Sequence, residues 1–262
     1  MSETAKFALI AALEREIQPL LHECRPITGD QAPPRDAAGT VSHPQRRFRY
    51  QDAVVICAGP GYKNASRAAQ RAIQAYAPEL IISIGFAGAL APEMGVGDIF
   101  VPRHVISERT ESSYTLARGR GVLVTAERVA GEERKRLLFS RFGAQAVDME
   151  AAAVAAEAAT RGCEFLALKV ISDTLASNVE FVSPFIRPEG FRAGAFLAHV
   201  SIRPWLWPAV RSLQRDSARA AENLCAAVRV LVSKGREVLA ELYGPARALQ
   251  ADVREDLRTP RQ

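Results

Sequence analysis

The sequence predicts an α/β protein: a three-layer α/β/α sandwich around a central mixed sheet, followed by a long C-terminal helix. Short apolar runs of strand length alternate with longer helical patterns, an order typical of layered α/β domains. The runs are too continuous for strands with one exposed face, which indicates a sheet covered on both sides. With 262 residues, the chain is long enough to bury a large core.

The expected elements follow one another in the order of such a sandwich. Strands are expected at residues 7–13, 47–50, 53–57, 80–84, 99–106, 144–147 and 165–171. Helices are expected at residues 64–76, 131–142, 149–160 and about 209–239. Gly85 and Gly88 are expected to break the strand at 80–84, because glycines interrupt regular structure. The polar stretch 28–45 is interpreted as a surface loop and 107–121 as a mobile segment.

The last quarter of the chain is predicted to add a helical extension. Residues 1–205 are assigned to one main domain, and residues 206–262 to a C-terminal extension packed on it. Apolar side chains recur at helical spacing in the extension, which predicts an amphipathic helix. They are Leu213, Ala220, Ala221, Leu224, Val228 and Leu231. The final twenty or so residues are charged and are expected to fray.

Composition and charge are those of an ordinary globular protein. The chain is 48% apolar and 24% charged, with a net charge of +5. No block of five like charges occurs, so no nucleic-acid partner is expected. The first apolar run is too short for a membrane span and lacks the pattern of a signal peptide. The four cysteines lie far apart without a C-x-x-C pair, which favours reduced thiols and a cytoplasmic location.

Three acidic residues fall at the expected carboxyl ends of strands, where ligand sites assemble in α/β sheets. Glu16 follows the first strand, Glu150 opens a helix after a short strand, and Asp173 comes at the end of the last core strand. Each singly also fits a structural role, with Glu150 as a first-turn helix acid and Asp173 as a helix N-cap. Caps have no reason to gather at one end of a sheet, so the three together favour a functional site.

Two glycine-containing turns mark places where a ligand can approach the backbone. Gly59 and Gly61 lie between a strand and a helix, where N–H groups can bind an anion or the chain can simply turn. The run lacks the further residues of a dinucleotide-binding motif or a P-loop. At 85–88 an apolar strand runs into small residues, which indicates close approach of a ligand. The four histidines are scattered and no metal-binding motif occurs, so no metal is expected.

Six short motifs occur in order over the first two thirds of the chain. They are FALIAALERE at 7–16, GPGYKNA at 59–65, IGFAGAL at 84–90, GVGDI at 95–99, AVDMEAAA at 146–153 and ISD at 171–173. Together they resemble the nucleoside phosphorylase/nucleosidase family of the purine-nucleoside-phosphorylase type, especially its methylthioadenosine/S-adenosylhomocysteine nucleosidase branch. The resemblance runs from about residue 7 to 177, and the last two motifs are the most specific.

The resemblance implies a nucleoside-phosphorylase-like catalytic domain that cleaves the bond between a purine and its ribose without a cofactor. Asp173 would be the acid at purine N7, Glu150 would bind the ribose hydroxyls, and Glu16 would orient and deprotonate the attacking water. The chemistry agrees, because departure of an anionic base leaves a cationic sugar, which preorganised carboxylates stabilise. The acid would need its proton held by burial or by the base itself.

Further ligand contacts follow from the same resemblance. The substrate-binding positions would be Met149, Phe86, Ala87, Gly88, Arg128 and Val129. Met149 would pack under the sugar, and Arg128 and Val129 would line the base. Gly59 and Gly61 would border the site of the attacking water or phosphate.

The chain departs from the family at two places. Phe86 stands where the family usually has a serine, which touches phosphate in phosphorylases, so the phosphate site is weakened. The segment between Val101 and Leu123 is shorter than in the methylthioadenosine enzymes and lacks much of the part that closes the pocket from a neighbouring subunit. These departures and the segment RPWLWP at 203–208 are similar to a hopanoid-associated phosphorylase branch, which removes adenine from a lipid-bearing nucleoside.

Three functions therefore compete. Hydrolysis of an adenosine-type nucleoside is favoured by Glu16 and Phe86. Phosphorolysis, including the hopanoid-associated type, would use inorganic phosphate as co-substrate and needs an anion site. A non-catalytic nucleoside-binding protein would have less need of an acid at Asp173. The expected partner is a small-molecule nucleoside; the resemblance also implies a homo-oligomer, and membrane contact is expected only if the substrate is lipid-linked.

Overall fold

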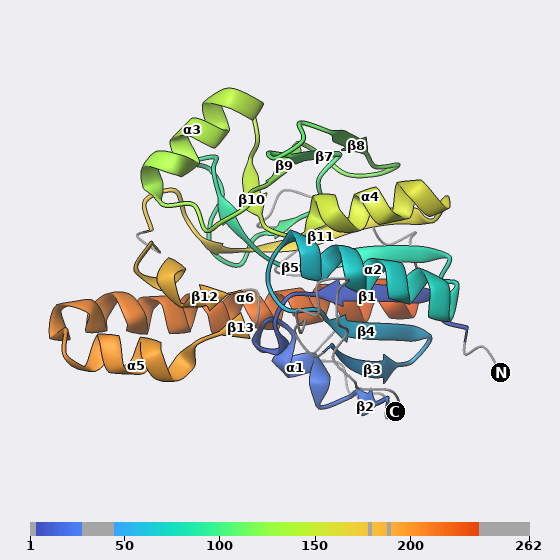
Figure 1. Ribbon diagram of the computed structural model, residues 1–262, viewed down its shortest axis with the longest axis horizontal. Helices are drawn as coiled ribbons and strands as arrows, with labels where there is room; N and C mark the ends of the chain where they lie inside the picture. The colour runs from blue at the N-terminus through green and yellow to red at the C-terminus, as the bar shows by residue number, and fades with distance from the viewer. Residues whose placement is uncertain (1–3, 28–44, 178–179, 188–189, 236–262) are drawn as a thin grey trace, which may run out of the picture.

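The computed structural model describes residues 4–27, 45–177, 180–187 and 190–235, and these residues form the predicted three-layer α/β/α sandwich (Figure 1). Nearly all of the predicted loop at 28–45 lies outside the described residues. So do the part of the predicted C-terminal helix beyond residue 235 and the expected frayed end.

The strands of the central mixed sheet come from almost the whole of the first 173 residues. They are β1 (Phe7–Ala11), β2 (Arg25–Pro26), β3 (Arg46–Tyr50), β4 (Ala53–Cys57), β5 (Leu80–Ala89), β6 (Ile99–Phe100), β7 (His104–Ser107), β8 (Ser113–Thr115), β9 (Val122–Thr125), β10 (Ala146–Asp148) and β11 (Glu164–Asp173). Their order is β2-β3-β4-β1-β5-β10-β9-β7-β8, with β11 paired to β5 and β6. A separate hairpin joins β12 (Ile186–Arg187) to β13 (Gly190–Phe191).

Helices cover both faces of the sheet (Figure 1). They are α1 (Gln18–Leu21), α2 (Tyr62–Tyr76), α3 (Glu132–Phe142), α4 (Ala151–Arg161), α5 (Ala193–Ser201) and α6 (Trp207–Lys234), with short 3-10 turns η1 (Glu14–Glu16), η2 (Glu180–Phe185) and η3 (Pro204–Leu206). The alanine-rich helices α2 and α4 pack together on one face, and α6 packs on the other against β11 and α1. Alanine suits this position because it favours helix and allows close approach to the sheet.

The long helix α6 belongs to the main core over its C-terminal half. Leu224, Val228 and Leu231 are fully buried in the same apolar cluster as residues of β1, β5 and β11. The predicted amphipathic stripe therefore faces the sheet, while the domain division at residue 205 stays a prediction. Among the described residues, no helix combines the length and the apolar character needed to cross a membrane.

Three local predictions were wrong. The strand predicted at 80–84 does not break at Gly85, because β5 continues to Ala89 and β11 pairs with it along its length. Gly85 has φ +145, so it bends the strand without ending it. The single strand predicted at 99–106 is split into β6 and β7, because Pro102 lacks the N–H that a continuous ladder needs. The polar segment 107–121 contributes strand β8.

The sheet topology brings the acidic segments to one edge. Strands β4 and β5 run parallel to β1, and β11 runs parallel to β5. The carboxyl ends of these four strands therefore lie on the same side of the sheet. The turn after β1, the bend of β5 and the end of β11 therefore lie close together. β10 runs antiparallel to the end of β5 and brings the segment that follows it to the same place.

Candidate active site

A cavity of about 160 Å³ lies at this edge of the sheet. Nearly all of the predicted site residues line it. They are Glu16, Phe86, Ala87, Gly88, Arg128, Val129, Met149, Glu150 and Asp173. Gly59 and Gly61 are not part of the lining, although Pro60 between them is.

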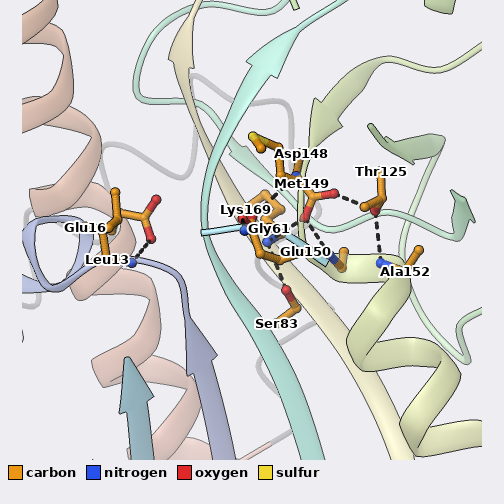
Figure 2. A network of polar contacts seen from close by, with 11 residues as sticks. Leu13, Glu16, Gly61, Ser83, Thr125, Asp148, Met149, Glu150, Ala152 and Lys169 are labelled. Carbon is orange, nitrogen blue, oxygen red and sulfur yellow. Dashed lines mark hydrogen bonds and ion pairs between the residues drawn. The ribbon is translucent and has the colours of Figure 1, made fainter. Parts of the chain in front are cut away.

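Glu16 closes one side of the cavity from the turn after β1. It ends η1 and is buried, and its Oε2 accepts a hydrogen bond from the Leu13 N–H at 3.1 Å (Figure 2). A Cβ on Gly85 would stand 3.1 Å from the same oxygen, so the bend in β5 leaves room for this carboxyl. Burial raises the pKa of Glu16 above its ordinary value, against the lowering effects of the Leu13 hydrogen bond and of Arg15. A carboxyl with a raised pKa is a better proton acceptor when ionised.

Glu150 stands at the start of α4 and reaches across to the glycine turn. Its Oε1 accepts a hydrogen bond from the Gly61 N–H at 2.7 Å, and its Oε2 accepts one from the Met149 N–H at 3.3 Å (Figure 2). Burial, followed by the negative charge of Asp148, raises the pKa of Glu150 to about 7, although Lys169 acts in the opposite direction. The two N–H groups fix the carboxyl, leaving it at the cavity wall.

Glu150 does not cap its helix, although it occupies the N-cap position. The first N–H groups of α4 are bound by other residues: Ala151 N–H donates to Asp148 Oδ2 at 2.8 Å, and Ala152 N–H donates to Thr125 Oγ1 at 2.9 Å (Figure 2). These bonds perform the capping that helix starts require. The sequence left open for Glu150 the role of a first-turn helix acid; Glu150 instead precedes the first turn, which holds no acidic residue.

Beside the cavity, whose lining includes Asp148, lies a buried ion pair that sequence reasoning missed. Lys169 Nζ lies 2.8 Å from Asp148 Oδ2, with side chains 1% and 0% exposed. Lys169 also donates to Ser83 Oγ at 2.9 Å, and Thr125 Oγ1 donates to Asp148 Oδ1 at 2.6 Å. The network ties β5, β9, β10 and β11 together, and its satisfied hydrogen bonds offset the cost of burying two charges.

Asp173 ends β11 and lines the same cavity. Its side chain is 14% exposed, Oδ1 accepts a hydrogen bond from Ser172 Oγ at 2.7 Å, and Oδ2 contacts the ammonium of Lys135. It does not cap a helix, because the described residues that follow it form a turn. A Cβ on Gly88 would stand 2.9 Å from Oδ2, so the small residue predicted beside the ligand is what gives this carboxylate its room.

The two glycine N–H groups that could have held an anion are already bonded. Gly59 N–H donates to the Ala12 carbonyl at 2.9 Å, and Gly61 N–H donates to Glu150. Both glycines have positive φ, at +85 and +92, which explains why glycine suits these positions. The turn therefore positions Glu150 and shapes the backbone, with neither N–H aimed into open space.

Apolar side chains from the C-terminal part of the chain complete the cavity wall. Val182 of η2, Ile186 of β12 and Leu213 of α6 line it, with Ser217 beside them. Phe86 and Met149 also face the cavity. The lining thus combines acidic residues near strand ends with apolar residues, several of which lie beyond residue 180.

Lys135, Lys169 and Asp148 are the functional neighbours that the sequence did not reveal. Lys135 lies in the charged run EERKR, which is typical of a solvated helix face, yet it is 1% exposed. Lys169 interrupts an otherwise apolar strand sequence. A lysine within a strand expected to be buried on both faces must have a partner, and this signal could have indicated a buried acid.

The described residues contain no group of three histidine, cysteine or acidic side chains that could bind a metal ion. The four cysteines are free thiols. Burial raises the pKa of the Cys57 thiol well above its ordinary value, so this side chain has the character of a small core residue.

Comparison with known proteins agrees with this architecture. A curated 5′-methylthioadenosine/S-adenosylhomocysteine nucleosidase from Shewanella halifaxensis (strain HAW-EB4) is 29% identical over 100 residues. The aligned part covers 38% of this chain and 41% of that relative, so the match spans less than half of the relative's length.

Solved structures share the fold over most of the chain. Futalosine hydrolase of Helicobacter pylori strain 26695 superimposes with a TM-score of 0.63 at 17% identity, covering 88% of this chain and 98% of its own. The 5′-methylthioadenosine nucleosidase of Arabidopsis thaliana gives 0.62 at 18% identity, with 93% and 98% covered. The Neisseria meningitidis 5′-methylthioadenosine/S-adenosylhomocysteine nucleosidase in complex with methylthio-immucillin-A gives 0.63 at 17%, with 87% and 98% covered.

At these identities the structural likeness concerns the fold. Family membership rests on the sequence profile described as Phosphorylase superfamily, which matches residues 6–120 and 114–200. These ranges contain the four acidic residues that line the cavity and almost the whole sheet. The chain belongs to the phosphorylase superfamily.

Proposed function

We propose that this protein is a nucleosidase that hydrolyses the N-glycosidic bond of an adenosine-type purine nucleoside and releases adenine. The observation that carries the proposal is the convergence of Glu16, Glu150 and Asp173 on one cavity from three separate segments. The nucleosidases among its relatives support the same reaction class.

The environments of the three carboxyls suit three different tasks. Glu150 is fixed by two backbone N–H groups, which suits a group that binds ribose hydroxyls and stabilises positive charge on the sugar. The buried Glu16 has a raised pKa, which suits a base for the attacking water. Asp173 lies in the same cavity beside the Lys135 ammonium, which suits a group that delivers a proton to N7 of the leaving base. The retained acidic set argues against a protein that only binds nucleosides.

Water is favoured over phosphate as the nucleophile. A phosphate site requires free backbone N–H groups or arginine side chains in a suitable fork. The N–H groups of Gly59 and Gly61 donate to protein acceptors, and the two arginines that line the cavity, Arg15 and Arg128, share it with the three carboxyls. Phe86 adds an apolar ring to the wall. Glu16 and Glu150 would also repel a phosphate placed between them.

The test is release of adenine from adenosine and methylthioadenosine, measured with and without inorganic phosphate. Hydrolysis predicts equal rates in both conditions and free ribose or its 5′-substituted form as product. A strict requirement for phosphate, with a sugar 1-phosphate as product, would overturn hydrolysis in favour of phosphorolysis. Binding without turnover in either condition would favour the non-catalytic alternative. Glu127→Gln, at an acid 67% exposed and outside the cavity, is the control for non-specific charge effects.

The 5′ substituent is proposed to be apolar. Val182, Ile186 and Leu213 contribute apolar side chains to the cavity lining, and such a lining favours a group without charge. A panel of adenosine analogues with hydroxyl, methylthio, butylthio and longer alkyl groups at 5′ would test this. The expected result is a KM that falls as the alkyl group lengthens; a KM lowest for free hydroxyl would contradict it.

The protein is also proposed to be a cytoplasmic homo-oligomer. In Figure 1, α5 and the first turns of α6 extend beyond the sheet, and Ile202, Trp205 and Trp207 are 71%, 70% and 46% exposed there. Large exposed apolar side chains that lie together are typical of interfaces. Light scattering should give a multiple of 28.5 kDa, and Trp205→Arg should lower it. A monomer that binds anionic lipid vesicles would instead favour membrane contact.

A further inference from the structure

Lys135 is a fully buried cation of the cavity lining, and the proposed mechanism has not used it. It projects from α3 and is 1% exposed. Its Nζ contacts Asp173 Oδ2 and donates to the Thr174 carbonyl at 2.6 Å. A Cβ on Gly88 would stand 3.2 Å from its Cε, so the aliphatic stem passes closely over the strand. The ammonium is held by two acceptors at the end of β11 and still lines the cavity.

The state of Asp173 raises a chemical question. Oδ1 accepts a hydrogen bond from Ser172 Oγ, and Oδ2 accepts one from Lys135. A carboxyl whose two oxygens both accept hydrogen bonds presents no O–H of its own. In this arrangement Asp173 has no proton to give to a leaving base, although the proposed reaction needs one at N7. The nearest proton is on Lys135.

We propose that Lys135 supplies the proton that Asp173 delivers to the leaving purine. This inference rests on the proposed nucleosidase function. As the C1′–N9 bond breaks, its electron pair moves into the purine ring and N7 becomes basic. The Asp173 carboxylate takes a proton from the Lys135 ammonium and gives one to N7, so Lys135 is left as a neutral amine.

The remaining atoms balance through Glu16. A water oxygen bonds to C1′, and Glu16 takes the proton that this water loses. After the products leave, Glu16 releases its proton to solvent and Lys135 takes one up. The net reaction is nucleoside plus water to purine plus ribose. Lys135 acts through Asp173, so it is a positioning and proton-supplying residue.

The competing explanation is that the pair only fastens α3 to β11. Two substrates separate the explanations. A purine nucleoside needs a proton on its leaving group, whereas 4-nitrophenyl β-D-riboside releases a stable anion and needs none. A purely structural lysine affects both substrates alike; a proton source affects the purine nucleoside alone.

The experiment uses the full chain with Lys135→Met and the matched control Arg136→Met. Arg136 is on the same helix with a side chain 67% exposed. Lys135→Met should lower kcat for the purine nucleoside about 10²- to 10⁴-fold, as for loss of general acid catalysis, with KM little changed. Its rate on the nitrophenyl riboside should stay within about threefold of wild type, because that step needs no acid. Arg136→Met should match wild type on both.

A second variant separates the proton from the charge. Lys135→Ala leaves space beside Asp173, and added ethylammonium should restore purine release. Tetramethylammonium, which has the same charge and no N–H, should not. Circular dichroism checks that each variant folds, and Lys135→Arg, which keeps the charge, should retain the fold but remain slow on the purine nucleoside.

Three results would overturn the inference: equal losses on the two substrates, rescue by tetramethylammonium, or full activity in Lys135→Arg. Failure of the proposed function is distinguishable, because it would appear in the wild-type protein. If wild type cleaves no purine nucleoside, both proposals fall. If wild type cleaves it and Lys135→Met loses both substrates equally, only the role of Lys135 falls.

Discussion

The molecule holds two buried aspartate–lysine pairs, and they differ mainly in what surrounds the acid. Asp148 and Lys169 are 0% and 1% exposed, and hydrogen bonds from Thr125 and the Ala151 N–H engage both oxygens of the aspartate. Both aspartates belong to the cavity lining, but in the second pair Asp173 is 14% exposed, although Lys135 is as buried as Lys169. The same two side-chain types thus form one pair whose aspartate is fully buried, called the sealed pair, and one whose aspartate is partly exposed, called the open pair.

The comparison shows that an aspartate–lysine ion pair can either stabilise the fold or take part in a reaction. A sealed pair with satisfied hydrogen bonds has one stable arrangement, and removing either partner leaves a charge without compensation. A pair that opens on a cavity can exchange one of its contacts for a ligand atom. The two pairs therefore differ in the exposed fraction of the aspartate side chain.

The largest expected effect is on turnover at the open pair. Asp173→Asn should lower kcat about 10²- to 10⁴-fold, because an amide cannot pass a proton to N7. Binding of a non-hydrolysable nucleoside analogue should persist, since the rest of the wall is unchanged. Steady-state kinetics and calorimetric titration check the two halves of the prediction. Undiminished turnover would show that Asp173 has no acid role.

The sealed pair should respond in stability. Lys169→Met leaves Asp148 buried without its cation and should lower the free energy of unfolding by about 3–5 kcal/mol. Urea unfolding followed by circular dichroism measures it. Lys135→Met should cost less, because water in the cavity can solvate Asp173. Equal losses at the two lysines would break the distinction between sealed and open pairs.

Crowding the open pair should have an intermediate effect. A methyl group on Gly88 would stand 2.9 Å from Asp173 Oδ2 and 3.2 Å from Lys135 Cε. Gly88→Ala should therefore displace the carboxylate and lower kcat about 10-fold or more, since overpacking of this kind costs about 1–3 kcal/mol. Gly95→Ala is the matched control, because its Cβ would meet Asp98 Oδ2 at an ordinary 3.7 Å. Similar rates for both variants would count against the close contact.

The smallest expected effect is the pH dependence contributed by Glu150. Its pKa is raised to about 7 in the folded chain, chiefly by burial and then by Asp148. The folded state then binds this proton more tightly than the unfolded state, so protonation favours folding. The contribution is full below pH 4.5 and is lost as the pH rises to about 7.

Two measurements check this sign. Wild-type stability should fall between pH 5 and pH 7.5 by more than that of Glu150→Gln, in denaturant unfolding at each pH. The kcat/KM of wild type should rise toward pH 7, by at most about tenfold per pH unit, as Glu150 ionises. A wild-type stability that rises relative to the variant over this range would contradict the raised pKa.

Much of the fold was predictable because the strands are short, apolar and bounded by glycine or charge. Those boundaries also placed Glu16, Glu150 and Asp173 at strand ends, and the sheet topology then brought them together. The continuation of β5 past Gly85 could not be predicted in the same way. It depends on pairing with β11, which lies about eighty residues later in the chain, and periodicity within a segment carries no information about such a partner.

The lysines were missed for a related reason. Lys135 reads as solvated because its neighbours in the sequence are charged, and only the packing of α3 over β11 buries it. Lys169 of β11 pairs with Asp148 of β10, twenty-one positions earlier, and both of these strands are hydrogen-bonded to β5. In both cases the lysine is buried by contacts between segments that are distant in the sequence. The acids of the site were therefore predictable from their positions at strand ends, and their lysine partners were not.

Helix α6 connects the core to the cavity lining within one continuous helix. Its buried half packs with the sheet through Leu224 and Leu231, and its earlier turns present Leu213 and Ser217 to the cavity. A shift of the helix by an ångström at one end moves the other end by a similar amount. Substitutions at buried core positions of α6 that do not contact a ligand are therefore expected to change ligand preference as well. Directed evolution toward a new nucleoside should accumulate changes in both halves of this helix.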